Sequence, residues 1–133
     1  MINQITVDHN PSLYSERDRI YSQGGYVENV GGVDRVDGKI AVSRSFGDRN
    51  MISKGIVVEP AVAILRNFNT ADERYIIMAT DGLWDMVEND EAALMVGMIM
   101  AGGGTWQDAA ERLTKEAYVR GGKDNIGVSI VKI

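Results

Sequence analysis

The sequence predicts an α+β fold with a largely antiparallel sheet, and two observations support this prediction. Apolar runs of strand length occur at residues 56–65, 74–80 and 126–132. Residues 88–100 and 105–120 instead place apolar residues at helical spacing, for example Ala109, Leu113 and Ala117. Strands and helices that come in separate blocks favour α+β over an alternating α/β arrangement.

The amino-terminal segment predicts a strand followed by a helix. Residues 2–7 intersperse apolar and polar side chains, which predicts a short strand ending at Asp8. The sequence Asn10-Pro11-Ser12 predicts a turn and helix cap before a helix over 13–22, which Gly24 and Gly25 end. Residues 26–55 carry many glycines and charges, so we expect a projecting lobe with short strands.

The remaining elements follow in order. A polar turn around 67–70 joins the predicted strands 56–65 and 74–80, and Pro60 predicts an edge position or a bulge in the first. Thr105 is expected to cap the helix over 105–120. No internal repeat or low-complexity tract divides the 133 residues.

Composition excludes several classes of function. The net charge of −5 argues against a nucleic-acid or anionic-membrane binder, which needs a basic face. Without cysteine the chain has no disulfide, thiolate nucleophile or thiolate zinc site, and a single histidine, His9, excludes a histidine-rich zinc site. Residues 1–4 show no signal-peptide pattern, and no apolar run approaches the roughly 18 residues that span a bilayer. We expect an intracellular protein of the cytoplasm or nucleus.

Two aspartates predict a metal–carboxylate site. Asp81 follows the strand 74–80, and Asp124 precedes the strand 126–132. If the two strands are antiparallel neighbours, both carboxylates lie at the same edge of the sheet. Magnesium and manganese prefer oxygen ligands, often one or two carboxylates with water. Asp8 is a third acid at a predicted strand end.

Each of these residues also has an ordinary structural interpretation. An aspartate at a strand end is usually a turn or cap residue. Gly82 raises the interest of Asp81, because glycine lets a backbone carbonyl or water come close to a cation. Asp85 either caps the next turn or supports the metal indirectly. Arg44 either binds phosphate or forms a structural ion pair.

Taken together, these segments resemble the C-terminal half of the type 2C protein phosphatases, the metal-dependent serine/threonine phosphatase family. The resemblance covers nearly the whole chain, and its motifs are specific in their order and spacing. The matching motifs are Thr6-Val7-Asp8-His9-Asn10-Pro11, Arg19-Ile20 with Gly24-Gly25, Arg35-Val36-Asp37-Gly38, Ala41-Val42-Ser43-Arg44-Ser45-Phe46-Gly47-Asp48, Ala79-Thr80-Asp81-Gly82-Leu83-Trp84-Asp85 and Asp124-Asn125-Ile126.

The resemblance implies part of a β-sandwich flanked by helices, with a metal centre at one end. It implies that a water activated by Mg²⁺ or Mn²⁺ attacks phosphoserine or phosphothreonine in a phosphoprotein substrate, with two or three ions in the complete enzyme. By resemblance, Asp81 and Asp124 are metal ligands, and Asp8 belongs to a weaker third site at which Asp85 assists. Residues 1–133 then form the C-terminal part of one catalytic domain. Residues 26–55 form a flap-like lobe that carries Arg44 on the substrate side.

The chain departs from the family in its missing motifs. The family's Glu-Asp pair, its Asp-Gly-His-Gly motif and its phosphate-holding arginine have no counterpart here. We therefore expect the chain to act as part of a longer enzyme and to be inactive by itself. The alternative is a truncated, non-catalytic module that acts through partner binding or as a homodimer, by an exposed sheet or by exchange of elements.

Overall fold

The computed structural model describes residues 2–64 and 75–133, which belong to two compact units. Unit 1 comprises Met1–Gln4 and Leu65–Ile133, and unit 2 comprises Ile5–Ile64. Each unit has its own cluster of buried apolar side chains.

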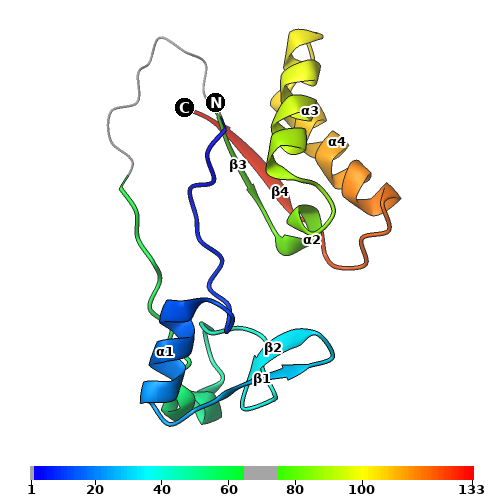
Figure 1. Ribbon diagram of the computed structural model, residues 1–133. Coiled ribbons are helices and arrows are strands. Elements are labelled where there is room, and N and C mark those ends of the chain that lie inside the picture. The colour runs from blue at the N-terminus through cyan, green and yellow to red at the C-terminus, as the bar shows by residue number, and fades with distance from the viewer. Residues whose placement is uncertain (1, 65–74) are drawn as a thin grey trace. The chain divides into compact units, whose positions relative to one another are not determined.

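Unit 2 combines one helix, a β-hairpin and a 3₁₀ segment (Figure 1). Its elements are α1 (Tyr14–Ser22), β1 (Val27–Val30), β2 (Val33–Val36) and η1 (Arg49–Lys54). β1 and β2 pair antiparallel, with Val27 opposite Val36 and Val30 opposite Val33. Gly31 and Gly32 form the two-residue turn with φ of 62° and 89°, a conformation that suits the right-handed twist of a hairpin.

The core of unit 2 is small and depends on a close approach of two backbones. Ile20, Val36, Met51 and Ile56 are buried together. Gly55, with φ of 91°, lies so close to α1 that a Cβ there would be 2.7 Å from Ile20 Cα. Only glycine fits this position, since a side chain would meet both the positive φ and the helix backbone.

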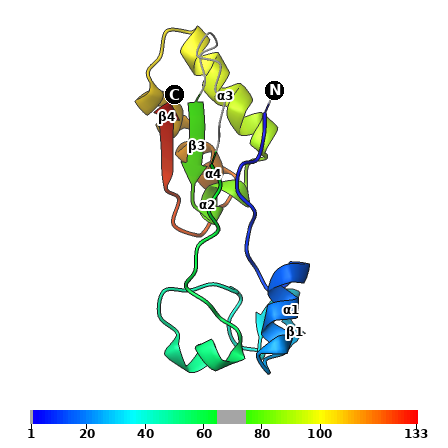
Figure 2. The ribbon, with the colours of Figure 1, turned by 90° about the vertical axis from the view of Figure 1, so that its left-hand side faces the viewer.

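Unit 1 is a two-stranded antiparallel ladder covered on one face by helices (Figures 1 and 2). Its elements are β3 (Tyr75–Ala79), α2 (Asp81–Trp84), α3 (Asn89–Ala101), α4 (Trp106–Val119) and β4 (Val128–Lys132). Figure 2 shows β3 and β4 side by side, with α4 behind them. The buried core between ladder and helices consists of Leu83, Val87, Ala92, Val96, Ala109, Leu113 and Ala117.

The register of the ladder brings distant parts of the chain to one end. Tyr75 pairs with Lys132 at one end, and Ala79 pairs with Val128 at the other. The chain leaves β3 into α2 at the end where it enters β4 (Figure 1). This confirms the predicted antiparallel pairing and the shared edge.

The other face of the ladder is apolar and partly open. Tyr75, Ile77 and Ala79 point into the core, so Ile76 and Met78 point away from it. Val131 lies opposite Ile76, and Met78 and Val131 are exposed.

The predicted α+β class is confirmed, and so are the helices over 13–22, 88–100 and 105–120 to within one residue at each end. Thr105 caps α4 through a capping box with Asp108, as expected. None of the described helices has the length and hydrophobicity to span a bilayer.

Two predicted strands are wrong. Residues 2–7 form no strand, so Asp8 is not at a strand end. Residues 56–64 contribute only a bridge between Val57 and Arg44, while the predicted turn at 67–70 lies outside the described residues. An apolar pattern becomes a strand only when a partner completes its hydrogen bonds, and within residues 2–64 and 75–133 neither segment has a ladder. The predicted cap also differs, because Leu13 is the N-cap of α1 without a side-chain bond.

Candidate metal centre

Asp81 is placed by the junction between β3 and α2. The strand ends at Ala79, and α2 begins at Asp81 itself. The backbone N–H of Gly82 donates to Asp81 Oδ1 at 3.0 Å, which fixes the carboxylate against the first turn. Asp81 is exposed, and its other carboxylate oxygen has no hydrogen-bond partner among the described residues.

Asp124 lies in the loop between α4 and β4, and it has the same local arrangement. The N–H of Asn125 donates to Asp124 Oδ1 at 2.7 Å, and the residue is exposed. Its second carboxylate oxygen is likewise without a hydrogen-bond partner in the described part of the chain.

Thr80 joins these two segments. Its backbone N–H donates to the carbonyl oxygen of Gly127 at 3.0 Å, extending the ladder by one step. Its hydroxyl donates to the carbonyl oxygen of Asn125 at 2.8 Å and accepts from the N–H of Gly127 at 3.0 Å. The residue before Asp81 is thus bonded to the residues that follow Asp124.

Gly82 brings the two backbones into contact. A Cβ at position 82 would lie 2.5 Å from the carbonyl oxygen of Asn125 and 3.0 Å from its carbon, which no real side chain tolerates. The sequence singles out Gly82 for a close approach to a cation. The structure gives it a close approach to the Asp124 loop instead, which leaves a role beside a metal as a prediction.

A shallow depression of about 260 Å³ opens beside this contact. Gly82, Asp85 and Asp124 line it, so the structure brings together three of the predicted site residues. The other lining residues are Met86, Gly121, Gly122 and Lys123. Asp81 adjoins the depression through Gly82 and does not line it.

The donor set fits a hard cation held largely by water. Within residues 2–64 and 75–133, no group of three or more acidic, histidine or cysteine side chains is arranged to hold a metal ion. Asp81 and Asp124 each offer one carboxylate oxygen that has no partner among the residues that the structure describes. Magnesium is commonly bound by one or two carboxylates with several waters, and this pair supplies that minimum.

Asp8 is exposed and belongs to unit 2, whereas Asp81 and Asp124 belong to unit 1. A site shared by all three acids therefore stays a prediction.

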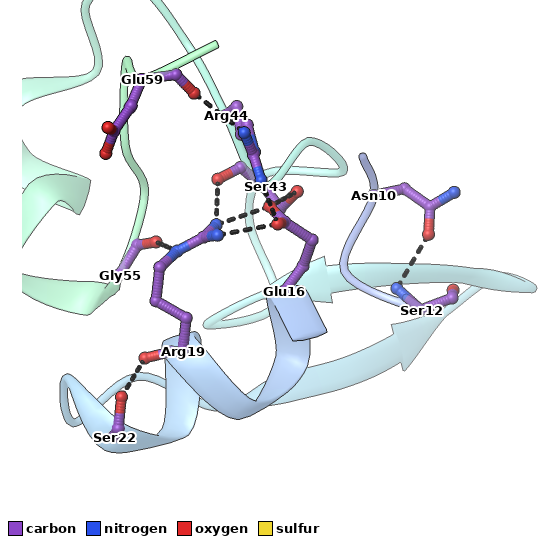
Figure 3. Close-up of polar contacts among 9 residues, drawn as sticks. All are labelled: Asn10, Ser12, Glu16, Arg19, Ser22, Ser43, Arg44, Gly55 and Glu59. Carbon is purple, nitrogen blue, oxygen red and sulfur yellow. Dashed lines mark hydrogen bonds and ion pairs between the residues drawn. The ribbon is translucent and has the colours of Figure 1, made fainter. Parts of the chain in front are cut away.

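Arg44 forms an ion pair inside unit 2 (Figure 3). Its Nη2 lies 2.6 Å from Oε1 of Glu16 and its Nε 3.1 Å from Oε2. Arg19, one turn after Glu16 on α1, also binds both carboxylate oxygens, at 2.8 and 2.6 Å. The structure thus gives Arg44 one of the two roles that the sequence leaves open, and contact with a substrate stays a prediction.

Glu16 is the buried centre of this group, with 1% of its surface exposed. The hydroxyl of Ser43 adds a third donor at 2.7 Å. Burial alone would raise the pKa of the Glu16 carboxyl, but hydrogen bonds from Arg44, Arg19 and Ser43 outweigh it and lower the pKa far below its usual value. Glu16 is not among the site residues that the sequence predicts, although its spacing of three residues from Arg19 on a helix is a signal for an ion pair.

Arg120 supports the loop that carries Asp124. Arg120 ends α4 and binds Glu91 of α3, Glu116 of its own helix at 3.0 Å, and the carbonyl oxygen of Met86 at 3.0 Å. The hydrogen bonds to the carboxylates of Glu91 and Glu116 raise the pKa of Arg120 above its usual value. The start of the 121–124 turn is therefore held against α3 and the segment before it, as well as against α4.

The family model and the similar proteins point to the same protein family. The sequence model of the protein phosphatase 2C family matches residues 1–126. A probable protein phosphatase 2C of rice is 41% identical over 131 residues, covering 98% of this chain and 39% of the rice protein. One from Arabidopsis thaliana is also 41% identical, covering 96% of this chain and 39% of that protein. The chain thus spans about two fifths of the length of these relatives.

Solved structures agree with the sequence comparison. A serine-threonine phosphatase 2C from Toxoplasma gondii superposes with a TM-score of 0.77 at 25% identity, covering 96% of this chain and 46% of that chain. A C. elegans sex-determining protein gives a TM-score of 0.79 at 26% identity, covering 96% of this chain and 31% of that chain.

Proposed function

The chain belongs to the protein phosphatase 2C family, and from this we propose that it is part of a metal-dependent phosphatase acting on phosphoserine and phosphothreonine in proteins. The observation that carries the proposal is the junction at Thr80, which joins the segments that bear Asp81 and Asp124. Hard cations such as Mg²⁺ are commonly bound by one or two carboxylates together with water, and these two segments bring two carboxylates to the same end of the ladder.

In this proposal, Asp81 and Asp124 hold Mg²⁺ or Mn²⁺, with two or three ions in the complete enzyme. The chemistry that such ions supply is activation of a bound water for attack on phosphorus. The residues of this chain contribute two fixed carboxylates and a depression in which Asp85 adds negative charge. Lys123 lines the same depression, and its ammonium group offers a cation for the phosphoryl oxygens.

The chain alone supplies only part of the centre. It contains no Asp-Gly-His-Gly motif, whose aspartate bridges the metals in the family that it resembles. In-line attack needs both sides of the metal clamp and a fixed phosphoryl group. We therefore expect the 133 residues by themselves to hydrolyse p-nitrophenyl phosphate no faster in excess manganese than their Asp81→Asn variant.

The test joins the chain to the amino-terminal half of a family member that carries this motif. The chimera should hydrolyse p-nitrophenyl phosphate and a phosphothreonine peptide with manganese, and Asp81→Asn should abolish both activities. Asp90→Asn, an exposed acid at the start of α3, is the matched control and should leave the rates unchanged. A chimera whose metal-dependent turnover survives Asp81→Asn would contradict the proposal.

A second candidate function rests on the open face of the ladder. Met78 and Val131 are exposed there next to Ile76, and an uncovered apolar sheet face favours association. The chain would then form homodimers through this face without catalysis. Sedimentation velocity at micromolar concentration should show a dimer that Met78→Lys converts to monomer. Leu94→Lys, at an exposed position of α3, is the control and should leave the dimer intact. A wild-type chain that stays monomeric at all concentrations rejects this candidate function.

A further inference from the structure

We infer that Thr80 is a positioning residue of the metal centre, whose hydroxyl sets the Asp81 turn against the Asp124 loop. The inference rests on the proposed function, because it assigns a role in the centre that Asp81 and Asp124 form there. It adds a residue whose side chain is not itself a metal ligand.

The first argument is that the hydroxyl of Thr80 forms its hydrogen bonds with residues that follow Asp124. Thr80 occupies the N-cap of α2, where a threonine side chain ordinarily accepts a hydrogen bond from its own helix. Here no side-chain cap bond forms. The hydroxyl instead donates across the chain to Asn125 O at 2.8 Å and accepts from Gly127 N at 3.0 Å. Both bonds go to the segment after Asp124, so the side chain serves that segment and not the helix.

The second argument is the conformational freedom of the Asp124 loop. Gly121, Gly122 and Gly127 surround Asp124 in sequence, and glycines lose more freedom than other residues when they are ordered. The ladder itself ends at Ala79 and Val128. Beyond that point, the backbone N–H of Thr80 adds one bond to Gly127 O, and the hydroxyl of Thr80 adds the bonds to Asn125 and Gly127. The packing of Gly82 on Asn125 and the bonds of Arg120 at the end of α4 also hold the loop.

The third argument is that the γ-methyl group of Thr80 packs against the backbone of Gly127. A Cβ at Gly127 would lie 3.4 Å from the γ-methyl of Thr80, an approach at the edge of ordinary contact. The methyl group therefore packs on Gly127 while the hydroxyl bonds to the backbone on either side of Ile126. Valine keeps the shape of this side chain and loses both side-chain bonds, whereas serine keeps the hydroxyl.

The experiment measures Mn²⁺ binding to the 133-residue chain by the loss of the electron paramagnetic resonance signal of free Mn²⁺. Residues that orient metal ligands typically contribute about tenfold or more to affinity. Thr80→Val should therefore bind Mn²⁺ about tenfold more weakly than wild type, and Thr80→Ser should stay within about twofold because its hydroxyl is retained. Thr114→Val is the matched control, since the Thr114 hydroxyl bonds to Ala110 O within α4, and it should bind as wild type does.

A second measurement follows the hydrogen bond itself. The amide hydrogen of Gly127 should exchange faster in Thr80→Val than in wild type, and at the wild-type rate in Thr80→Ser. Retained exchange protection in the core of α4 shows that the Thr80→Val protein is folded.

The outcomes separate the two proposals. Equal Mn²⁺ affinity in wild type and Thr80→Val, with Asp81→Asn weakened, overturns the role of Thr80 and leaves the metal centre standing. Weakening in Thr80→Ser as large as in Thr80→Val also overturns it, because the hydroxyl would then not be the cause. If Asp81→Asn binds Mn²⁺ as wild type does, the metal centre fails and the role of Thr80 fails with it.

Discussion

At the scale of single residues, the carboxylate of Glu16 is a buried charge with several hydrogen-bond partners. The guanidiniums of Arg19 and Arg44 pair with its charge, and the hydroxyl of Ser43 donates a hydrogen bond to it. Arg19 also binds the backbone carbonyls of Ser43 and Gly55, and Arg44 binds that of Glu59 (Figure 3). One side chain of α1 thereby organises three later segments of unit 2. A buried charge is costly unless it is fully paired. Loss of any one member of this group should therefore destabilise the others.

We predict that Glu16→Gln destabilises unit 2 by about 3 kcal/mol at pH 7, because it leaves two partly buried guanidiniums short of a counter-charge. The folded-state pKa of Glu16 lies below the ordinary 4.5, so its contribution is full above that pH and is lost as pH falls. The difference between wild type and variant should therefore shrink below about pH 4.5. The exchange rates of the α1 amides, corrected for the intrinsic pH dependence of exchange, measure this difference in stability at each pH.

Asp18→Asn supplies the control on the same helix, since Asp18 is exposed and makes no hydrogen bond or ion pair within the described residues. Its effect should stay within about 0.5 kcal/mol. A pH-independent difference for Glu16→Gln would contradict the assignment of the stabilisation to the charge.

At the scale of elements, α4 shows the clearest local signal. Thr105 accepts from the N–H of Asp108 at 3.1 Å, and the Asp108 carboxylate accepts from the N–H of Thr105 at 2.7 Å. Hydrogen bonds from the hydroxyl and the N–H of Thr105 lower the pKa of Asp108. Two of the four free N–H groups at the start of α4 are thus satisfied.

We predict that Thr105→Ala lowers the free energy of unfolding of unit 1 by about 1 kcal/mol. Thr114→Ala, within the same helix, should be neutral or slightly stabilising because alanine has the higher helix propensity. Urea unfolding followed by the fluorescence of Trp84 and Trp106, both in unit 1, compares the two. Equal losses in both variants would mean that the cap contributes nothing.

The elements also show what a sequence can predict. Ala109, Leu113 and Ala117 recur at helical spacing and are all buried in α4, so periodicity alone located that helix. The strand expected at residues 2–7 failed because a strand depends on a partner that a sequence window does not contain. The shared edge of Asp81 and Asp124 could be predicted from two strand ends. The bonds of Thr80 could not, because the sequence does not show that residues 125–127 lie against its side chain.

At the scale of the whole molecule, residues 2–64 and 75–133 contain one apolar core in each of the two units. Leu113 and its neighbours form that of unit 1, and Ile20, Val36, Met51 and Ile56 form that of unit 2. The unit 2 core has fewer buried side chains, so we expect unit 2 to be the less stable of the two.

We predict that Leu113→Ala lowers the stability reported by tryptophan fluorescence by about 2–5 kcal/mol. Ile56→Ala, a truncation of an equally buried aliphatic side chain, should leave that signal within about 0.5 kcal/mol of wild type and instead accelerate amide exchange in α1. An equal shift of the tryptophan signal in both variants would show that the units unfold together.

The pairing of Ala79 with Val128 has a consequence for protein engineering. The ladder and Thr80 determine the separation of the Asp81 and Asp124 segments, whereas α3 and α4 form an excursion that leaves the ladder and returns to it. Gly102, Gly103 and Gly104 connect these helices, with Gly103 at φ of 80°. A tag inserted at Gly103 would lengthen the excursion without altering the ladder. That turn is where a reporter can be inserted while the two aspartates keep their spacing.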